Sequence, residues 1–128
     1  MIILDPLQDV LDGLSNEDQA IFMKWSKGFI KSHGVLFVYI NHMNKSQEGG
    51  EKGIMGSSTI IKSASANILL TRDKLAEDPI VRNTTDISVP KNRVCGITGP
   101  AGKVYYDNQT HTLWDLDAWL QENGTRDF

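Results

Sequence analysis

The sequence predicts an α/β domain with a mostly parallel sheet and a C-terminal antiparallel hairpin. Residues 1–4 and 35–40 are short, continuous apolar runs typical of buried parallel strands, and a stretch with helical periodicity separates them. Residues 104–106 and 112–114 are strand-like runs on either side of a polar turn that begins at Asp107, a pattern typical of a hairpin.

The composition fits one modest globular core. Of the 128 residues, 40% are hydrophobic and 23% charged. No apolar run approaches the length of a membrane span, and no signal peptide is evident, so we expect a cytoplasmic protein without a membrane partner. The single cysteine, Cys95, excludes an internal disulfide and fits a reducing compartment. A net charge of -3 argues against a generally basic nucleic-acid surface but allows a local basic groove.

The first strand, residues 1–4, ends at Asp5. An aspartate at this place holds magnesium in nucleotide-hydrolysing folds, although many buried strands of other folds also end in Asp. Because a central strand at the N-terminus has no preceding element, we expect the chain to be a piece of something larger. Residues 6–14, with Pro6 and Gly13, predict a surface loop.

A helix is expected from the Ser15 cap to about Ser32, before Gly34, because Ile21, Trp25 and Phe29 recur at helical spacing. The strand at residues 35–40, expected to be buried on both faces, then completes a right-handed parallel crossover. Asn41 and His42 follow this strand, at the sheet end where open α/β folds bind ligands. The same pattern also arises where a strand simply ends in a polar loop.

The rest of the chain alternates loops and short elements. In order, we expect a mobile loop at residues 43–53, a short segment at 56–65, a buried strand at 68–70, a turn at 75–79, an exposed strand at 80–89, the hairpin, and a terminal helix with Leu116, Trp119 and Leu120 that ends at Gly124.

Residues 96–103 imitate a phosphate-binding loop but fail its pattern. The first glycine of the motif would stand at Ile97, and Lys103 is followed by Val104 rather than by Ser or Thr. We therefore reject a phosphate loop here.

Several short motifs follow one another in a specific order. They are Ile2-Ile3-Leu4-Asp5, Lys27-Gly28-Phe29-Ile30-Lys31-Ser32-His33-Gly34, Ile40-Asn41-His42, Gly56-Ser57-Ser58, Ala66-Asn67-Ile68-Leu69 and Lys91-Asn92-Arg93-Val94-Cys95-Gly96-Ile97-Thr98-Gly99. In this order they resemble the C-terminal half of the RecA-like motor of DnaB-type replicative helicases, in the phage primase-helicase and Twinkle branch. The resemblance implies a partial RecA-like P-loop NTPase core over residues 1–114, with a short C-terminal helix and tail at 115–128.

The resemblance also implies a nucleotide site for ATP (or dTTP) with Mg²⁺. Asp5 matches the Walker B aspartate that organises the metal ion, and His42 matches the polar sensor of the γ-phosphate. Arg93 matches the arginine finger that reaches the neighbouring subunit's site, and Lys91 matches a second basic residue of that site. Tyr106 falls near the position that stacks on the nucleotide base, with Tyr105 as a one-residue alternative.

A single-stranded DNA interface is implied by a second group of matches. Gly56, Ser57 and Ser58 match small residues of the DNA-facing loop, and Lys62 matches its basic residue, although it could equally be an ordinary solvated lysine. The segment departs from the family at Ala66, where an acid often precedes the asparagine.

Together these matches imply an ATP-dependent helicase that forms a hexameric ring and moves along single-stranded DNA, 5′ to 3′, during replication. The family's phosphate loop and catalytic glutamate precede the Walker B strand, so we expect this chain to be inactive alone. A separate N-terminal phosphate-loop fragment or a primase is a possible partner, in the host cytoplasm if the source is a phage. Two alternatives stay open, a non-catalytic remnant that acts by assembly and a RecA- or KaiC-type ATPase relative.

Overall fold

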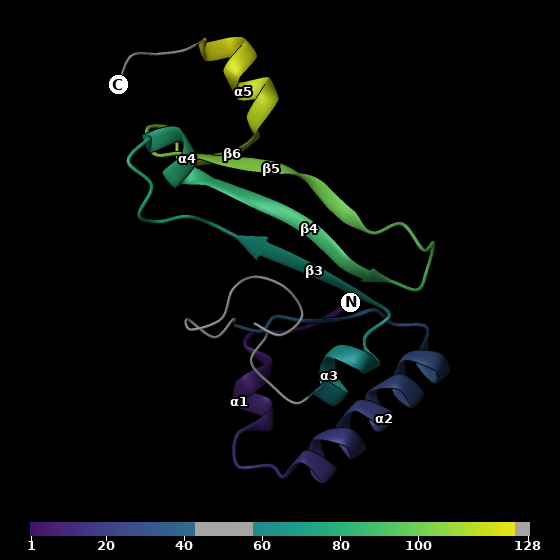
Figure 1. Ribbon diagram of the computed structural model, residues 1–128. Coiled ribbons are helices and arrows are strands. Elements are labelled where there is room, and N and C mark those ends of the chain that lie inside the picture. Colours follow the sequence, from purple (N-terminus) through teal and green to yellow (C-terminus); the bar gives the residue numbers. More distant parts are fainter. Residues whose placement is uncertain (43–57, 125–128) are drawn as a thin grey trace. The chain divides into compact units, whose positions relative to one another are not determined.

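The chain divides into two compact units. A computed structural model describes residues 1–42 and 58–124 (Figure 1). Unit 1 is Met1–Ala64 and unit 2 is Ser65–Phe128. The predicted loop at residues 43–53 lies outside the described residues.

Unit 1 contains a parallel strand pair. Its elements are β1 (Ile2–Leu4), α1 (Leu7–Leu11), α2 (Asn16–His33), β2 (Phe37–Tyr39) and α3 (Ser58–Ser63). Strands β1 and β2 are parallel, with Ile2 opposite Phe37 and Leu4 opposite Tyr39. The predicted strand–helix–strand crossover is therefore confirmed.

Helix α2 begins and ends within one residue of the predicted bounds, because both caps are local. The Ser15 hydroxyl oxygen accepts a hydrogen bond from the Asp18 backbone N–H at 3.1 Å. At the other end, Gly34 adopts a left-handed conformation with φ 61°, and its N–H donates to the Ile30 carbonyl oxygen.

The two glycines of α2 and its cap should respond oppositely to alanine. Gly34→Ala is expected to destabilise unit 1 by about 1 kcal/mol, because a Cβ strains the left-handed backbone. Gly28→Ala is the matched control. Gly28 lies inside the helix with open space around its Cα, so alanine should stabilise the unit by roughly 0.5–1 kcal/mol. Thermal unfolding of the two variants measures both shifts, and equal shifts would contradict the expectation.

The core of unit 1 includes a helix that the sequence did not predict. Leu7 and Leu11 are 0% and 7% exposed and pack with Met23 and Ile60. The expected surface loop at residues 6–14 is therefore wrong. The two leucines are four residues apart, so a single helical turn puts both on the buried face.

Strand β2 is less buried than predicted. Its three residues are half-buried, and the flanking Leu36 and Ile40 are 60% and 39% exposed. The expectation of burial on both faces is wrong within the described residues, where β1 and β2 pair only with each other. Phe37 packs edge-on against Trp25 and Phe29 of α2, with ring centroids 6.5 and 6.0 Å apart.

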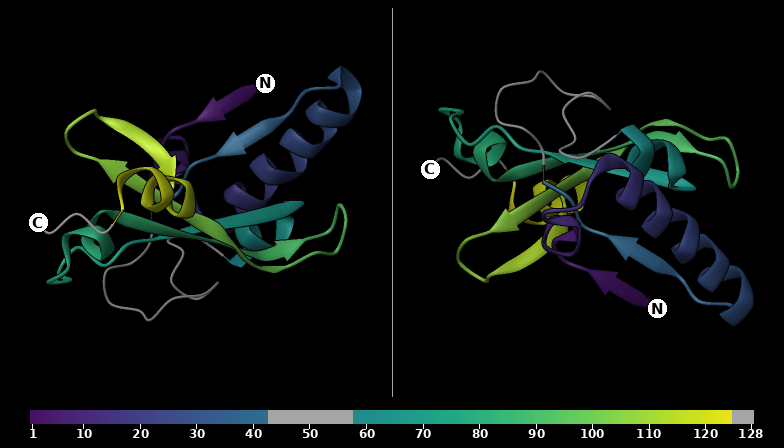
Figure 2. Two further views of the ribbon diagram at one scale, coloured as in Figure 1. Left: turned by 90° about the horizontal axis from the view of Figure 1, so that it is seen from above. Right: turned by 90° about the horizontal axis from the view of Figure 1, so that it is seen from below.

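Unit 2 is built on an antiparallel sheet. Its elements are β3 (Ala66–Thr71), α4 (Pro79–Asn83), β4 (Thr84–Asn92), β5 (Gly99–Asp107), β6 (Thr112–Asp115) and α5 (Leu116–Asn123). The four strands lie in the order β3-β4-β5-β6, each antiparallel to its neighbour (Figures 1 and 2).

The predicted mostly parallel sheet is therefore wrong, although the α/β class and the C-terminal hairpin are confirmed. The parallel sheet has two described strands and the antiparallel sheet has four. Only short turns join β4 to β5 and β5 to β6, and such turns cannot link parallel strands.

Two local predictions in unit 2 are right only in part: residues 84–89 are strand within β4 and residues 68–70 are strand within β3. The start of the expected exposed strand at residues 80–89 is α4, which Asp78 caps by accepting the Ile80 N–H at 2.8 Å. Asp followed by Pro is a helix-start signal that outweighs the strand-like composition. In the expected buried strand at 68–70, Leu69 is 9% exposed, but Ile68 and Leu70 are 69% and 60% exposed, because alternate residues face opposite sides of the sheet.

The terminal helix is confirmed as α5. The Asp115 carboxylate caps it by accepting the Ala118 N–H at 3.1 Å, and Gly124 follows its last residue. Trp119 is 2% exposed and packs on Tyr105 of β5, with ring centroids 4.3 Å apart. This aromatic pair anchors α5 to the sheet.

Candidate functional site

The carboxyl ends of β1 and β2 bring the first group of predicted site residues to one sheet edge. Asp5 directly follows β1, and Asn41 and His42 follow β2 after Ile40. Because the strands are parallel, these residues leave the sheet at the same end. The Asp5 and His42 side chains are exposed, whereas Asn41 is half-buried.

Backbone hydrogen bonds fix the chain on both sides of this edge. The Ile40 N–H donates to the Leu4 carbonyl oxygen at 2.9 Å, and the Leu7 N–H donates to the Ile40 carbonyl oxygen at 2.7 Å. The segment around Asp5 is thus tied to the residue that precedes Asn41. An exposed carboxylate and an exposed imidazole on such a rigid edge can bind a metal ion and a phosphate oxygen.

A polar cavity in unit 1 is lined by residues that were not predicted from the sequence as site residues. Its volume is about 440 Å³, and its walls include Asp9 and Asp12 from α1 and the following turn, together with Gln19 and Asn41. The Gln19 Oε1 atom is buried and has no hydrogen-bond partner among the described residues. Because residues 6–14 were expected to form a surface loop, Asp9 and Asp12 were not predicted to line a cavity. The helical spacing of Leu7 and Leu11 was the available signal for α1, which carries Asp9, whereas Asp12 follows the helix in extended backbone.

The described part of the chain contains no cluster of three or more His, Cys, Asp or Glu side chains that could hold a metal ion. This does not exclude Mg²⁺ at Asp5. That ion usually takes one or two protein carboxylates and fills its other positions with water and substrate phosphates.

Only some of the predicted DNA-facing residues lie in the described part of the chain. Gly56 and Ser57 lie outside the described residues, and Ser58 is the first residue of α3. Lys62 lies in the last turn of that helix and is exposed, whereas Ile60 of the same helix is 6% exposed and joins the core. The apolar side of α3 therefore anchors the helix and leaves a lysine at the surface.

Arg93, Lys91 and Tyr106 belong to unit 2. Arg93 is exposed and directly follows β4, and its N–H donates to the Ser65 carbonyl oxygen at 2.9 Å. Lys91 is half-buried in β4, opposite Asn67 of β3. The structure therefore places the two basic residues two positions apart at one end of the sheet.

The two candidate tyrosines have different environments. Tyr105 is 4% exposed against Trp119, and burial and the nearby Asp107 raise the pKa of its hydroxyl. Tyr106 is half-buried, and its hydroxyl oxygen lies 2.9 Å from His111 Nδ1. Because the Tyr105 ring is packed within unit 2, Tyr106 is the better candidate for contact with a base.

Backbone N–H groups of the hairpin turn, above all that of Gln109, lower the pKa of the Asp107 carboxyl group.

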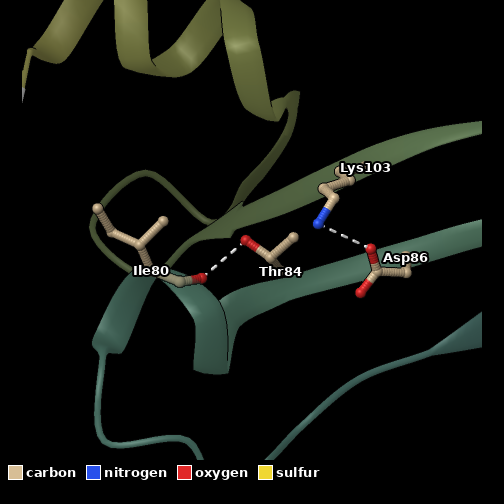
Figure 3. A network of polar contacts seen from close by, with 4 residues as sticks. All are labelled: Ile80, Thr84, Asp86 and Lys103. Carbon is tan, nitrogen blue, oxygen red and sulfur yellow. Dashed lines mark hydrogen bonds and ion pairs between the residues drawn. The ribbon is translucent and has the colours of Figure 1, made fainter.

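The glycine-rich stretch that imitated a phosphate loop has a structural role. Lys103 lies in β5, and its Nζ forms an ion pair with Asp86 of β4 at 3.0 Å (Figure 3). Nearby, the Thr84 hydroxyl donates to the Ile80 carbonyl oxygen at 2.7 Å and joins the start of β4 to α4. Lys103 is thus part of a sheet surface, which agrees with the rejection of a phosphate loop.

Comparison with known proteins shows similarity to a phage DNA helicase/primase. No protein-family model matches the chain. The chain is 26% identical to the DNA helicase/primase of Enterobacteria phage T3 over an alignment of 151 residues. This alignment covers the whole chain and 26% of the relative, so the chain spans about a quarter of that protein's length. At a coarse level the similarity supports a relationship to phage DNA helicases.

Among the helices of the described part of the chain, none combines the length and the apolar character that a membrane span requires.

Proposed function

We propose that this chain is the C-terminal portion of a ring-forming, ATP-dependent replicative helicase that moves along single-stranded DNA. The observation that carries the proposal is the parallel pair β1–β2, from which Asp5 and His42 leave at the same edge. The similarity of the whole chain to the phage T3 DNA helicase/primase supports it.

In this proposal unit 1 supplies two groups to a nucleotide site. Asp5 holds Mg²⁺, directly or through water, and the ion offsets the negative charge of the ATP (or dTTP) phosphates. His42 donates a hydrogen bond to the γ-phosphate and exchanges partners when that phosphate leaves.

Unit 2 supplies groups that act on the neighbouring subunit of a hexameric ring. The Arg93 guanidinium carries fixed donors that suit a transferring phosphoryl group, and Lys91 adds a second positive charge. Tyr106 contacts the nucleotide base. The phosphate loop comes from another part of the protein or from a separate chain, because the sequence has no such motif.

A chimaera tests this function directly. In the "T3 chimaera", the whole chain replaces the quarter of the phage T3 DNA helicase/primase that it matches. We expect nucleotide hydrolysis that single-stranded DNA stimulates, and we expect Asp5→Asn to abolish it. A folded, ring-forming chimaera that hydrolyses nucleotide equally well with Asp5→Asn would refute the proposed role.

The DNA-binding role of Lys62 is testable through salt dependence. Lys62→Ala in the T3 chimaera is expected to weaken binding to oligo-dT and to reduce the slope of log K against log salt by about 0.7 for each DNA phosphate that the lysine neutralises. Fluorescence anisotropy at several salt concentrations measures both effects. The matched control is Lys24→Ala, an exposed lysine of α2. Equal slopes for the two variants would remove Lys62 from the interface.

A second candidate function is that of a non-catalytic partner, which the missing phosphate-loop motif favours. In that case the full chain would assemble with a helicase and inhibit it. Inhibition of the intact phage T3 protein by added chain, with no hydrolysis by the T3 chimaera, would select this alternative.

A further inference from the structure

The turn that carries Arg93 is organised by the side chain of the preceding residue, Asn92. Its Oδ1 atom accepts hydrogen bonds from the backbone N–H groups of Val94 at 3.0 Å and Cys95 at 3.3 Å. Its Nδ2 group donates to the Ile97 carbonyl oxygen at 3.2 Å and to Cys95 Sγ at 3.0 Å. The Asn92 carboxamide thus forms hydrogen bonds with three residues that follow Arg93.

Backbone hydrogen bonds hold the other side of the same turn. The Arg93 N–H donates to the Ser65 carbonyl oxygen at 2.9 Å, and the Gly96 N–H donates to the Asn92 carbonyl oxygen at 3.0 Å. Asn92 itself is opposite Ala66 in the β3–β4 ladder. Arg93 therefore lies between a backbone that the sheet fixes and a turn that the Asn92 side chain fixes.

We propose that Asn92 is the positioning residue of Arg93: its carboxamide sets the direction in which the guanidinium leaves the sheet. The proposal rests on the proposed function of Arg93 as the group that acts on a neighbouring nucleotide site. Misplacement of a catalytic group by about 1 Å can lower a rate about a hundredfold. Hydrogen bonds that fix the backbone on both sides of Arg93 also fix the direction of its Cα–Cβ bond.

The residue type suits the task. Among side chains of this size, only a carboxamide accepts hydrogen bonds from two N–H groups and also donates one to a carbonyl oxygen. Asp at position 92 keeps both acceptor bonds, but it replaces the two donor bonds by a carboxylate oxygen that faces the Ile97 carbonyl oxygen. Leu has a similar shape and removes all four. The series Asn, Asp, Leu therefore removes the hydrogen bonds of the turn stepwise.

The experiment compares nucleotide hydrolysis by the T3 chimaera with Asn92→Leu, Asn92→Asp and Arg93→Ala. We expect Asn92→Leu to lower kcat about a hundredfold and to leave KM for the nucleotide within twofold. Asn92→Asp should have a kcat between those of Asn92→Leu and the native residue, because the bonds to Val94 and Cys95 persist. In the double variant with Arg93→Ala, Asn92→Leu should cause no further loss, because it acts only through Arg93.

Each other result has a definite meaning. If Arg93→Ala removes hydrolysis and Asn92→Leu does not change kcat, the positioning role is refuted and the proposed function stands. A further loss in the double variant means a general structural role and also refutes it. If Arg93→Ala itself has no effect on hydrolysis, the proposed function of Arg93 is refuted, and the positioning role of Asn92 is refuted with it.

A measurement on the full chain keeps the test decisive if the Leu variant of the chimaera does not fold. Amide hydrogen exchange at Val94 and Cys95 should be at least tenfold faster in Asn92→Ala than in the native chain, and slower in Asn92→Asp than in Asn92→Ala. Unchanged exchange in Asn92→Ala would show that the side chain does not hold the turn and would overturn the proposal.

Discussion

Arg93→Ala is expected to lower nucleotide hydrolysis by the assembled T3 chimaera at least about a thousandfold, because the role proposed for Arg93 is that of an arginine finger, which contributes 10³ or more to phosphoryl-transfer rates. Arg93 is an exposed residue directly after β4, which is compatible with the proposed action on a neighbouring subunit. Steady-state hydrolysis with saturating single-stranded DNA measures the effect. Lys is not an adequate replacement, since it lacks the planar set of donors.

The matched control for this prediction is Arg82→Ala. Arg82 is an exposed arginine in α4 of the same unit, and its removal should leave hydrolysis within about twofold of the native rate. Mixing supplies a second check. Rings made only of Arg93→Ala subunits, or only of Asp5→Asn subunits, should be inactive. Mixed rings should regain part of the activity, because some nucleotide sites then combine Asp5 of one subunit with Arg93 of its neighbour. No recovery on mixing would contradict action between subunits.

Leu7→Ala is expected to destabilise unit 1 by about 3–5 kcal/mol. Leu7 is 0% exposed and belongs to the core with Leu11, Met23 and Ile60, so its truncation leaves a cavity among groups that can only partly collapse. A loss of this size is a large part of the stability of a small unit. Hydrogen exchange of the α2 amides reports on unit 1 and measures the change.

Val10→Ala is the appropriate control for Leu7→Ala. Val10 lies in the same helix and is 42% exposed, so its truncation should change the free energy of unfolding by less than about 0.5 kcal/mol. If the two variants exchanged at the same rate, α1 would not be part of the core.

The elements predicted well are those that local chemistry decides. Helix α2 has a serine cap, a helical apolar pattern and a glycine stop, and all three signals act within a few residues. Helix α4 was not predicted because residues 80–83 are strand-like in composition, although Asp78-Pro79 is a helix-start signal. Helix α1 was missed because Pro6 and Gly13 suggested a loop, whereas burial of Leu7 and Leu11 against distant residues decides the structure.

The same distinction applies to the candidate site. The shared edge of Asp5 and His42 could be predicted, because any parallel crossover brings the carboxyl ends of its two strands together. The roles of Arg93 and Lys62 came from a family resemblance, and no periodicity or spacing in the chain indicates them. The Asn92 hydrogen bonds could not be predicted, because a side chain that bonds its own following turn leaves no repeat in the sequence.

The pairing pattern of the two units also has a consequence for the time course of folding. Unit 1 is closed by residues far apart in the chain, since its core joins Leu7 to Ile60 and its strand pair joins β1 to β2 across the whole of α2. Unit 2 pairs each strand with the next one along the chain. Loop closure is slower for distant residues than for neighbouring ones. We therefore expect the sheet of unit 2, which is synthesised after unit 1, to form its native strand pairs faster than unit 1 forms its core. In the released chain, the order of folding then differs from the order of synthesis.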